Sequence, residues 1–358
     1  MNAENMTILD IAREAGVSPA TVSRVLSDHP NVSAKTYDKV KRVIEKYNFK
    51  PNSMARGLLQ KSSRTLGVIM PDIKHPYYAS IFSSAQEEAN RSGYAVQIYR
   101  LAYNAMITDD FVDQLIERRL DGVLLAGGFI ESTNPNDLPR VLTRLQQYMP
   151  IVTICPPIPG LVCINIYTDL AAGMRKAVRH LAALGHERVA FIGATKETRS
   201  VGEREAGFLG EIERLGLVPI MQQENFHTPA MGETATLKLL TSHKKEDWPT
   251  ALIVVNDLMA LGVLKQLHGM GLRLPEDMAV IGYDNQFFSS FTQPPLTTIE
   301  VGSDEHGRVA MQQLLQARAS DSVPFTQVRE PSLIIRESCG AQLDRRDRRT
   351  LPSAYSEP

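Results

Sequence analysis

Residues 7–26 read TILDIAREAGVSPATVSRVL, and two short helices joined by a tight turn can be predicted from them. Thr7 and Asp10 have the spacing of a capping box, so a helix is predicted to begin after Thr7. Gly16 ends that helix, and Ser18 followed by Pro19 begins a second, because serine caps and proline suits the first turn. Each helix has an apolar face, made by Ile8, Ile11, Ala12 and Ala15 in the first and by Val22, Val25 and Leu26 in the second. The pattern predicts a helix-turn-helix.

A third helix and a basic charge complete this segment. Ser33 is a further N-cap, and the inward face of its helix comprises Val40, Val43, Ile44 and Tyr47. Residues 1–64 hold six Lys and five Arg against three Asp and three Glu, a net charge of +5. Since the whole chain carries −1, the remaining residues carry −6. A basic head on an acidic body is typical of a nucleic-acid-binding domain joined to a domain with another partner.

The outer side of the second helix is suited to DNA. Small polar or basic side chains point away from its apolar face: Ala20, Thr21, Ser23 and Arg24. Arg24 can bond bidentately to a guanine, and Ala20 can touch a thymine methyl group. Basic residues of the third helix suit phosphate contacts: Lys35, Lys39 and Arg42. An ordinary helical hairpin is the alternative, because helix pairs are common.

Residues 48–64, NFKPNSMARGLLQKSSR, carry a second signal. Pro51 is expected to stop the third helix, and Asn52 to cap a helical segment that is too short to be stable alone. We expect this segment to be helical only when DNA holds it. Leu58 would then be an apolar wedge in the minor groove, beside Arg56. The alternative is a plain linker whose leucines pack on the next domain.

After Arg64, short apolar runs alternate with helical patterns. Strands are predicted at 66–70, 95–99, 122–126, 151–155, 162–166, 188–192, 250–255 and 278–282. Helices are predicted at about 77–92, 108–119, 137–148, 169–184, 203–215, 231–242, 258–270 and 303–317. Near-continuous apolar strands separated by helices predict an α/β body of parallel sheets covered on both faces, and its length suits two doubly wound halves.

Several classes of protein are excluded or disfavoured. Cys155, Cys163 and Cys339 form no CxxC pair, which excludes a disulfide scaffold and a structural zinc site. No signal peptide is evident, and no apolar run approaches the ~18 residues of a membrane span, so we expect a cytoplasmic location. No P-loop, HExxH, GxSxG or GxGxxG motif occurs, so we expect neither an enzyme nor a cofactor.

The residues just after several predicted strands are candidates for a ligand site. They are Asp72 with Tyr77 and Tyr78 nearby, Gly127 and Gly128, Gly193, Asn256 and Asp257, and Tyr283 with Asp284. Ligands of doubly wound sheets bind beyond the carboxyl ends of the strands. Aromatic faces with hydrogen-bonding side chains suit a sugar or a nucleobase. Asp257 has an alternative role as the cap of the helix that starts at Leu258, and the two roles are compatible.

The motifs AGVSPATVSRVL, YNFKPN and ARGL resemble the head and hinge of the lactose-repressor/galactose-repressor (LacI/GalR) family of bacterial transcription regulators. The likeness continues to Cys339 through TLGVIMPDIKHPYY, HLAALGHERVAFIG, GEREAGF, VVNDLMALGVL and AVIGYDNQ. It implies a transcriptional repressor that binds a pseudo-palindromic operator as a homodimer, with Leu58 as the wedge. It also implies a body like that of sugar-binding periplasmic proteins, with two subdomains and a central effector cleft.

The candidate site residues come from these surfaces and from the resemblance. DNA contacts are expected from Thr7, Ser18, Pro19, Ala20, Thr21, Ser23, Arg24, Asn31, Ser53, Arg56 and Leu58. Effector contacts are expected from Tyr77, Tyr78, Gly128, Arg204, Phe226, Asn256, Asp257 and Asp284. The resemblance places Arg204 where it can bond effector oxygens and pair with Asp284. A sugar or sugar derivative suits these side chains better than a purine. Many family members have Asp-Asn where this chain has Thr168-Asp169, which leaves the specific effector open.

The expected organisation is a helix-turn-helix domain (1–50), a hinge (51–63), a body (64–340) and a disordered tail (341–358). The body would comprise an N-subdomain of about 64–164 and 296–327 and a C-subdomain of about 165–293 and 328–340. The tail lacks the apolar heptads of a tetramerising coiled coil, so a dimer is expected. Two rival functions are a transport binding protein, which would need a signal peptide, and an α/β enzyme, which would need a nucleophile or a phosphate loop. Whether the effector releases or tightens operator binding is not decided by the sequence.

Overall fold

The computed structural model describes residues 6–26, 30–49, 62–102, 105–127, 137–194, 199–224, 227–320 and 323–343. The chain divides into two compact units, Met1–Arg64 and Thr65–Pro358, which we describe separately. Nearly all of the expected hinge, and the tail beyond residue 343, lie outside the described residues.

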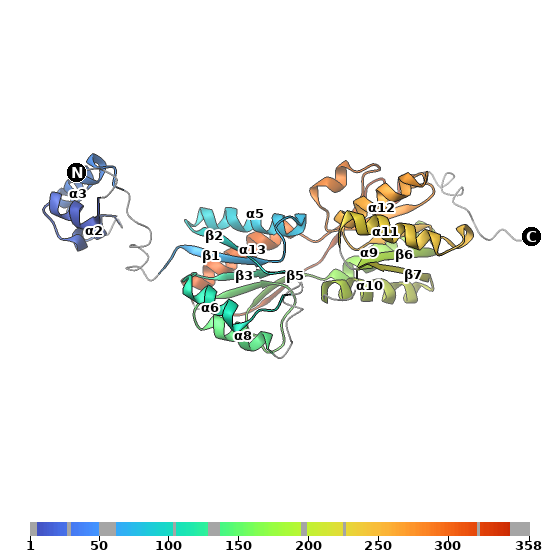
Figure 1. Ribbon diagram of the computed structural model, residues 1–358, viewed down its shortest axis with the longest axis horizontal. Coiled ribbons are helices and arrows are strands. Elements are labelled where there is room, and N and C mark those ends of the chain that lie inside the picture. The colour runs from blue at the N-terminus through green and yellow to red at the C-terminus, as the bar shows by residue number, and fades with distance from the viewer. Residues whose placement is uncertain are drawn as a thin grey trace, which may run out of the picture. The chain divides into compact units, whose positions relative to one another are not determined.

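The first unit contains the three predicted helices, α1 (Ile8–Glu14), α2 (Pro19–Leu26) and α3 (Ala34–Lys46), drawn in blue in Figure 1. Thr7 and Asp10 form the predicted capping box. Ser18 Oγ accepts from the Thr21 N–H over 3.2 Å, and Ser33 caps α3. The predicted apolar faces meet in one core of Ile11, Ala12, Ala15, Val22, Val25 and Val40. The helix-turn-helix prediction is therefore confirmed.

The end of α3 differs from the prediction. The helix ends at Lys46, before Pro51 is reached. Asn48 has a φ of 45°, in the left-handed region, and the Phe49 N–H donates to Ile44 O over 2.9 Å. This pattern closes a helix by the Schellman motif, in which asparagine accepts the left-handed position more readily than most residues. The stop is therefore made by Asn48 and not by the proline.

The first sheet of the body has the strand order β11-β5-β4-β3-β1-β2, and all of its strand pairs are parallel. Its strands are β1 (Thr65–Met70), β2 (Ala95–Arg100), β3 (Val123–Ala126), β4 (Ile151–Ile154), β5 (Ile164–Thr168) and β11 (Thr326–Arg329). Helices α5 (Pro76–Arg91) and α13 (Ser303–Ala319) cover one face, and α6 (Asp109–Glu117) and α8 (Leu138–Gln146) cover the other. Successive residues of β1 serve different cores: Val68 packs with α5, and Ile69 packs with α6.

The second sheet has the order β12-β10-β9-β8-β6-β7, and only the β10–β12 pair is antiparallel among its described pairs. Its strands are β6 (Arg188–Ala194), β7 (Val218–Glu224), β8 (Ala251–Val254), β9 (Ala279–Tyr283), β10 (Thr297–Glu300) and β12 (Ser332–Ile334). Helix α9 (Leu170–Ala183) packs on α10 (Arg199–Leu215), and α11 (Pro229–Thr241) packs on α12 (Asp257–Gly269), as Figure 1 shows. Short 3-10 helices lie at Lys245–Asp247 and Phe287–Phe291. The two doubly wound halves are therefore confirmed.

The chain crosses between the sheets after β5, after β10 and after β11. The expected subdomain limits differ from these crossings in two places. Strand β5 lies in the first sheet up to Thr168, and β10 (Thr297–Glu300) belongs to the second sheet although its residues were expected in the N-subdomain. Four strands were not predicted: β7, β10, β11 and β12. Three of them, β7, β11 and β12, lie at sheet edges. An edge strand can have a less apolar sequence than a central strand, and β7 even contains Pro219. The run of apolar residues that predicts a strand is therefore weak at sheet edges.

The three cysteines are buried, and none of them forms a disulfide. Among the described residues, no group of His, Cys, Asp and Glu side chains is arranged to hold a metal ion. No helix in the described part of the chain is both long and apolar enough to cross a bilayer.

Candidate functional site

Helix α2 and the serine before it carry six of the predicted DNA-contacting residues. Ser18, Pro19, Ala20 and Arg24 are exposed, and Thr21 and Ser23 are half-buried. The first turn of α2 has no acidic residue. Its amino end therefore combines a partial positive charge with small side chains, which allows close approach to phosphates and base edges.

Two further predicted contacts, Thr7 and Asn31, lie elsewhere in the first unit. Thr7 is the exposed N-cap of α1, and Asn31 is exposed before α3. The basic residues that we assigned to phosphates, Lys35, Lys39 and Arg42, are exposed on α3. Ser53, Arg56 and Leu58 lie outside the described residues.

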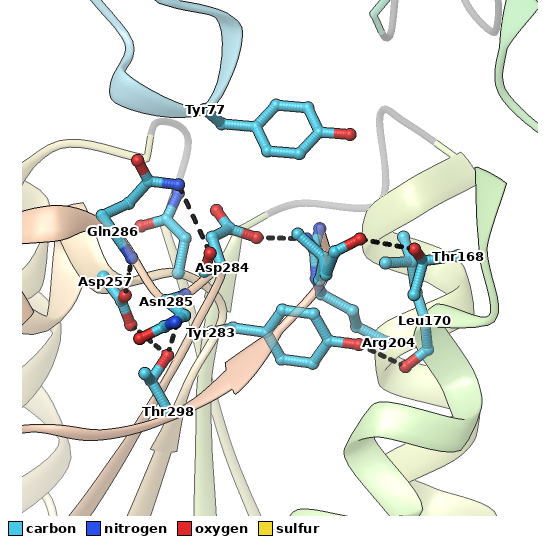
Figure 2. Close-up of polar contacts among 12 residues, drawn as sticks. Tyr77, Thr168, Leu170, Arg204, Asp257, Tyr283, Asp284, Asn285, Gln286 and Thr298 are labelled. Carbon is cyan, nitrogen blue, oxygen red and sulfur yellow. Dashed lines mark hydrogen bonds and ion pairs between the residues drawn. The ribbon is translucent and has the colours of Figure 1, made fainter. Parts of the chain in front are cut away.

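In the body, Arg204 and Asp284 form a buried ion pair between α10 and the residue after β9. Arg204 Nη2 donates to Asp284 Oδ1 over 3.0 Å (Figure 2). The guanidinium carbon lies 4.4 Å from the centroid of the Tyr283 ring, a cation–π distance. The resemblance had implied this pairing, and the structure confirms it.

The loop that carries Asp284 has an unusual backbone. Asp284 and Asn285 have φ values of 99° and 47°, in the left-handed region that non-glycine residues rarely adopt. Surrounding bonds hold the loop: the Asp284 N–H donates to Ile299 O over 2.8 Å, and Arg336 Nη2 donates to Asn285 Oδ1 over 2.7 Å. Strain that persists because its neighbours fix it is common at functional sites.

Asp257 does not cap α12, contrary to one alternative that the sequence left open. The N-cap is Asn256, whose Oδ1 accepts from the Met259 N–H over 2.8 Å. Asp257 is fully buried, and its two oxygens accept from Thr298 Oγ1 at 2.6 Å and from the Gln286 N–H at 2.7 Å. Burial raises the pKa of Asp257 well above its usual value, although the bond from Thr298 opposes the rise. The Asp257 carboxyl therefore holds the loop that carries Asp284, through the hydrogen bond from the Gln286 N–H.

Tyr77 and Tyr78 reach the same place from α5. Tyr78 is buried, and Tyr77 is half-buried, with the two ring centroids 5.1 Å apart in an edge-to-face arrangement. Tyr77 packs against the apolar cores of both halves. Figure 2 shows its ring facing the Arg204–Asp284 pair. We call this group the junction site, defined as Tyr77, Arg204, Asn256, Tyr283 and Asp284.

Sequence reasoning missed three side chains in or beside the junction site. Tyr283 was noted only as a strand-end aromatic, and His75 and His227 were not assigned a role. Burial lowers the pKa of His75 to about 4, and the Arg204 charge adds to the effect. Burial and then Arg204 likewise lower the pKa of His227 to about 4. Since His75 follows Pro71 and Asp72 at the end of β1, the strand-end rule could have found it.

Thr168 and Asp169, the pair that stands where many family members have Asp-Asn, lie at the end of β5, where the chain leaves the first sheet. Thr168 is buried, and its Oγ1 donates to Val301 O over 2.7 Å and lies 3.0 Å from His306 Nε2. Asp169 caps α9 by accepting from the Ala172 N–H. Thr168 therefore connects the end of β5 to the segment after β10 and to α13, and Asp169 begins the next helix. The expected contacts Gly128 and Phe226 lie outside the described residues.

Comparison with protein families gives two matches. Residues 7–52 match the bacterial regulatory proteins of the lacI family, and residues 178–339 match the periplasmic binding protein-like domain. The first match covers the whole helix-turn-helix, and the second covers most of the second half of the body.

Comparison with individual proteins extends over almost the whole chain. The HTH-type transcriptional repressor CytR of Escherichia coli K12 is 32% identical over 338 residues, which cover 94% of this chain and 96% of the relative. A crystal structure of the lac repressor dimer bound to operator and the anti-inducer ONPF matches with a TM-score of 0.83 and 29% identity, covering 94% of this chain and 99% of that one. The complex of the transcriptional regulator CelR with cellobiose has a TM-score of 0.66 and 26% identity, covering 93% of this chain and all of that one.

Proposed function

The chain belongs to the lacI family of bacterial regulatory proteins, and on this premise we propose how its two units act. The protein is a DNA-binding transcriptional repressor whose affinity for its operator is controlled by a small polar effector. Residues 1–50 bind DNA, 51–63 form the hinge, and 64–340 bind the effector and a second subunit.

DNA binding is assigned to the first unit. Two copies of α2 enter adjacent major grooves of a pseudo-palindromic operator, with Arg24 at a base edge. Hinge segments then fold on the operator, and Leu58 enters the minor groove. The exposed small side chains at the start of α2 and the +5 charge of residues 1–64 support this assignment.

Effector binding is assigned to the junction site, and the buried Arg204–Asp284 pair is the observation that carries it. A buried ion pair costs desolvation energy, and it is retained here beside aromatic rings and strained backbone. Hydrogen-bonding groups beside ring faces suit a sugar or sugar derivative, and the relative CelR was solved with cellobiose. The effector and the operator then influence each other by a coupling free energy that is reciprocal.

A homodimer is part of the proposal. Phe287 and Phe291 are 78% and 83% exposed on the 3-10 helix after β9. The residues that follow Phe291 line an open groove of about 580 Å³, whose lining comprises Leu261, Leu264, His268, Thr292 and Gln293. Large exposed apolar side chains beside a groove mark an interaction surface, and a second copy of the same surface is its simplest occupant.

The proposal contains no enzymatic step, because no nucleophile or phosphate-binding motif occurs in the sequence. It places the protein in the cytoplasm, where operator DNA is found. A transport binding protein is disfavoured, because such a protein needs no helix-turn-helix.

A mobility-shift assay on the promoter of the protein's own gene tests the proposal. We expect a shift at low salt that a neutral sugar changes, and the direction of the change tells inducer from corepressor. A panel of sugars, sugar phosphates and purines, first ranked by thermal shift, supplies the ligands. No sequence-specific shift on any promoter fragment would contradict DNA binding, and a purine as the only active ligand would contradict the sugar assignment.

A further inference from the structure

One contact joins the two halves of the body at the junction site. His75 is the N-cap of α5, which packs on the first sheet, and Asn256 is the N-cap of α12, which packs on the second. His75 Nε2 and Asn256 Nδ2 lie 3.5 Å apart. Whether these two nitrogens attract each other depends on where their hydrogens are.

The other contacts of the two side chains place those hydrogens. The Met259 N–H donates to Asn256 Oδ1 over 2.8 Å, so the NH₂ group of the amide faces His75. The Tyr77 N–H donates to His75 Nδ1 over 3.3 Å, so Nδ1 carries no hydrogen. A neutral imidazole has one N–H, which must then be on Nε2. Two donors therefore face each other between the two halves, and they form no hydrogen bond.

The other tautomer of His75 does not remove the conflict. With the hydrogen on Nδ1, the ring would oppose the Tyr77 N–H, and in a charged ring both contacts would fail. Burial and the Arg204 charge favour the neutral ring by lowering the pKa of His75 to about 4, although Asp72 acts in the opposite direction. One contact must fail in every state, and the longer one lies between the two halves.

A further unpaired donor belongs to the same group of residues. Arg204 Nε is buried and has no hydrogen-bond partner among the described residues, although Nη2 of the same guanidinium donates to Asp284. The Arg204 charge also lowers the pKa of His75. Buried N–H groups are almost always paired in folded proteins, and unpaired donors that converge on one place indicate a ligand that supplies acceptors.

We propose that His75 Nε2 and Asn256 Nδ2 bind one oxygen atom of the effector from the two halves of the body. An oxygen ~2.9 Å from both nitrogens satisfies both donors at once. Because each donor belongs to a different half, this shared oxygen holds the halves together. The ligand is uncharged and rich in oxygen, since the Arg204 charge is already paired with Asp284. This inference rests on the proposed function, because it takes the effector to bind at the junction site.

The unliganded protein provides the first test. Nitrogen NMR of the full chain with ¹⁵N-labelled histidine reads the tautomer of each ring, and the His75→Ser variant identifies the His75 signal. We expect a neutral ring with its hydrogen on Nε2 at pH 7. A hydrogen on Nδ1 alone overturns the proposal, because Nε2 would then accept directly from Asn256. A charged ring overturns the assignment of an uncharged ligand.

Calorimetric titration with D-ribose, cellobiose, D-glucose and glucose 6-phosphate provides the second test. His75→Ser supplies a hydroxyl oxygen that can cap α5, and Asn256→Asp keeps the oxygen that caps α12. Each change removes the nitrogen donor at its position. We expect either variant to weaken binding of a neutral sugar about tenfold. The double variant should lose no more affinity than the single variant with the larger loss, because both donors bind the same oxygen. His243→Ser, at an exposed histidine of the loop after α11, serves as the control that keeps full affinity.

The outcomes separate the two levels of the proposal. Losses that multiply in the double variant overturn the shared oxygen, and glucose 6-phosphate as the tightest ligand overturns the uncharged class. An unaltered protein that binds none of the four probes contradicts the proposed function for these ligands. In that case the NMR result still decides the donor pair by itself.

Discussion

Arg204 Nη2 donates to Asp284 Oδ1 over 3.0 Å, although the two residues are 80 positions apart in the chain. Arg204 is 9% exposed and Asp284 is 4% exposed. Burial raises the pKa of Asp284 to about 6, even though Arg204 opposes the rise. The same residue has a left-handed backbone. Two unfavourable features therefore coincide at one carboxylate, which is expected of a residue kept for binding and not for stability.

Replacement of Asp284 by alanine should abolish the effector response and leave operator binding by the unliganded protein nearly unchanged. The change removes an acceptor from the junction site and leaves the buried Arg204 charge unpaired. Asp284→Asn keeps the shape and should lose the response as well. The measurement is operator affinity with and without the first sugar that acts on the unaltered protein. Asp277→Ala removes a carboxylate from the half-exposed pair with Arg273 and is the matched control. A normal ligand titration of Asp284→Ala would remove this residue from the site.

His306 should make the stability of the body depend on pH. It is 2% exposed, and burial and the Arg329 charge lower its pKa from 6.5 to about 4. The unfolded chain therefore binds a proton more readily, so the contribution is present above pH 6.5 and is lost as the pH falls towards 4. Urea unfolding at pH 7 and pH 4.5 should show that His306→Gln removes roughly 2–3 kcal/mol of this loss.

The comparison isolates His306, because His75 and His227 have the same shift and stay in both proteins. Glutamine can still donate to Thr168 Oγ1, as His306 Nε2 does. Equal losses of unfolding free energy in the two proteins would show that His306 is not the titrating group.

Replacement of Arg24 by alanine should weaken operator binding by ~1–3 kcal/mol and relax specificity at one base position, as expected for a bidentate contact to guanine. The residue is exposed in the last turn of α2. Titrations against operators with single base changes provide the measurement. Arg91→Ala, at an exposed arginine in the last turn of α5, is the matched control. Unchanged preference at every position would refute the base contact.

A charge at Phe291 should separate the proposed dimer. Phe291→Asp puts a carboxylate on an 83% exposed apolar side chain, and burying that charge against a second subunit is costly. Analytical ultracentrifugation should show a folded monomer with weakened operator binding. Val162→Asp changes a 71% exposed valine in the loop before β5 and should leave the dimer intact. A dimer with unaltered stability in Phe291→Asp would place the interface elsewhere.

Gly262 is needed where α12 crosses α11. A Cβ atom at this position would lie 1.7 Å from Pro229 O and 2.6 Å from Pro229 C, which are backbone atoms that cannot move aside easily. Gly262→Ala should lower the free energy of unfolding by ~1–3 kcal/mol, the usual cost of overpacking. Gly269→Ala lies in the same helix with nothing within 4 Å and should be neutral or slightly stabilising. Equal effects of the two substitutions in urea unfolding would contradict the close approach.

Much of the fold could be predicted because its signals are local. A capping box spans Thr7 to Asp10, and the helices of the body were predicted to within a few residues of their ends from apolar spacing. Strand β7 (Val218–Glu224) was not predicted, because an edge strand can form without a continuous apolar run. The crossing after β10 was also misplaced, since sheet membership depends on pairing partners far away in the chain.

Three features follow from the amino-acid sequence alone: the helix-turn-helix, the alternation of strands and helices, and the set of polar residues at strand ends. These features depend on hydrogen bonds between residues three or four positions apart and on the periodicity of apolar side chains. They can therefore be predicted without knowledge of the tertiary structure. Three other facts are visible only in the folded chain. Asn256 and not Asp257 caps α12, Asp257 accepts a hydrogen bond from the loop that carries Asp284, and His75 Nε2 lies against Asn256 Nδ2. Each of these facts depends on which atoms the order of the strands brings together and on which of their hydrogens already have partners, and neither is a local property of the chain.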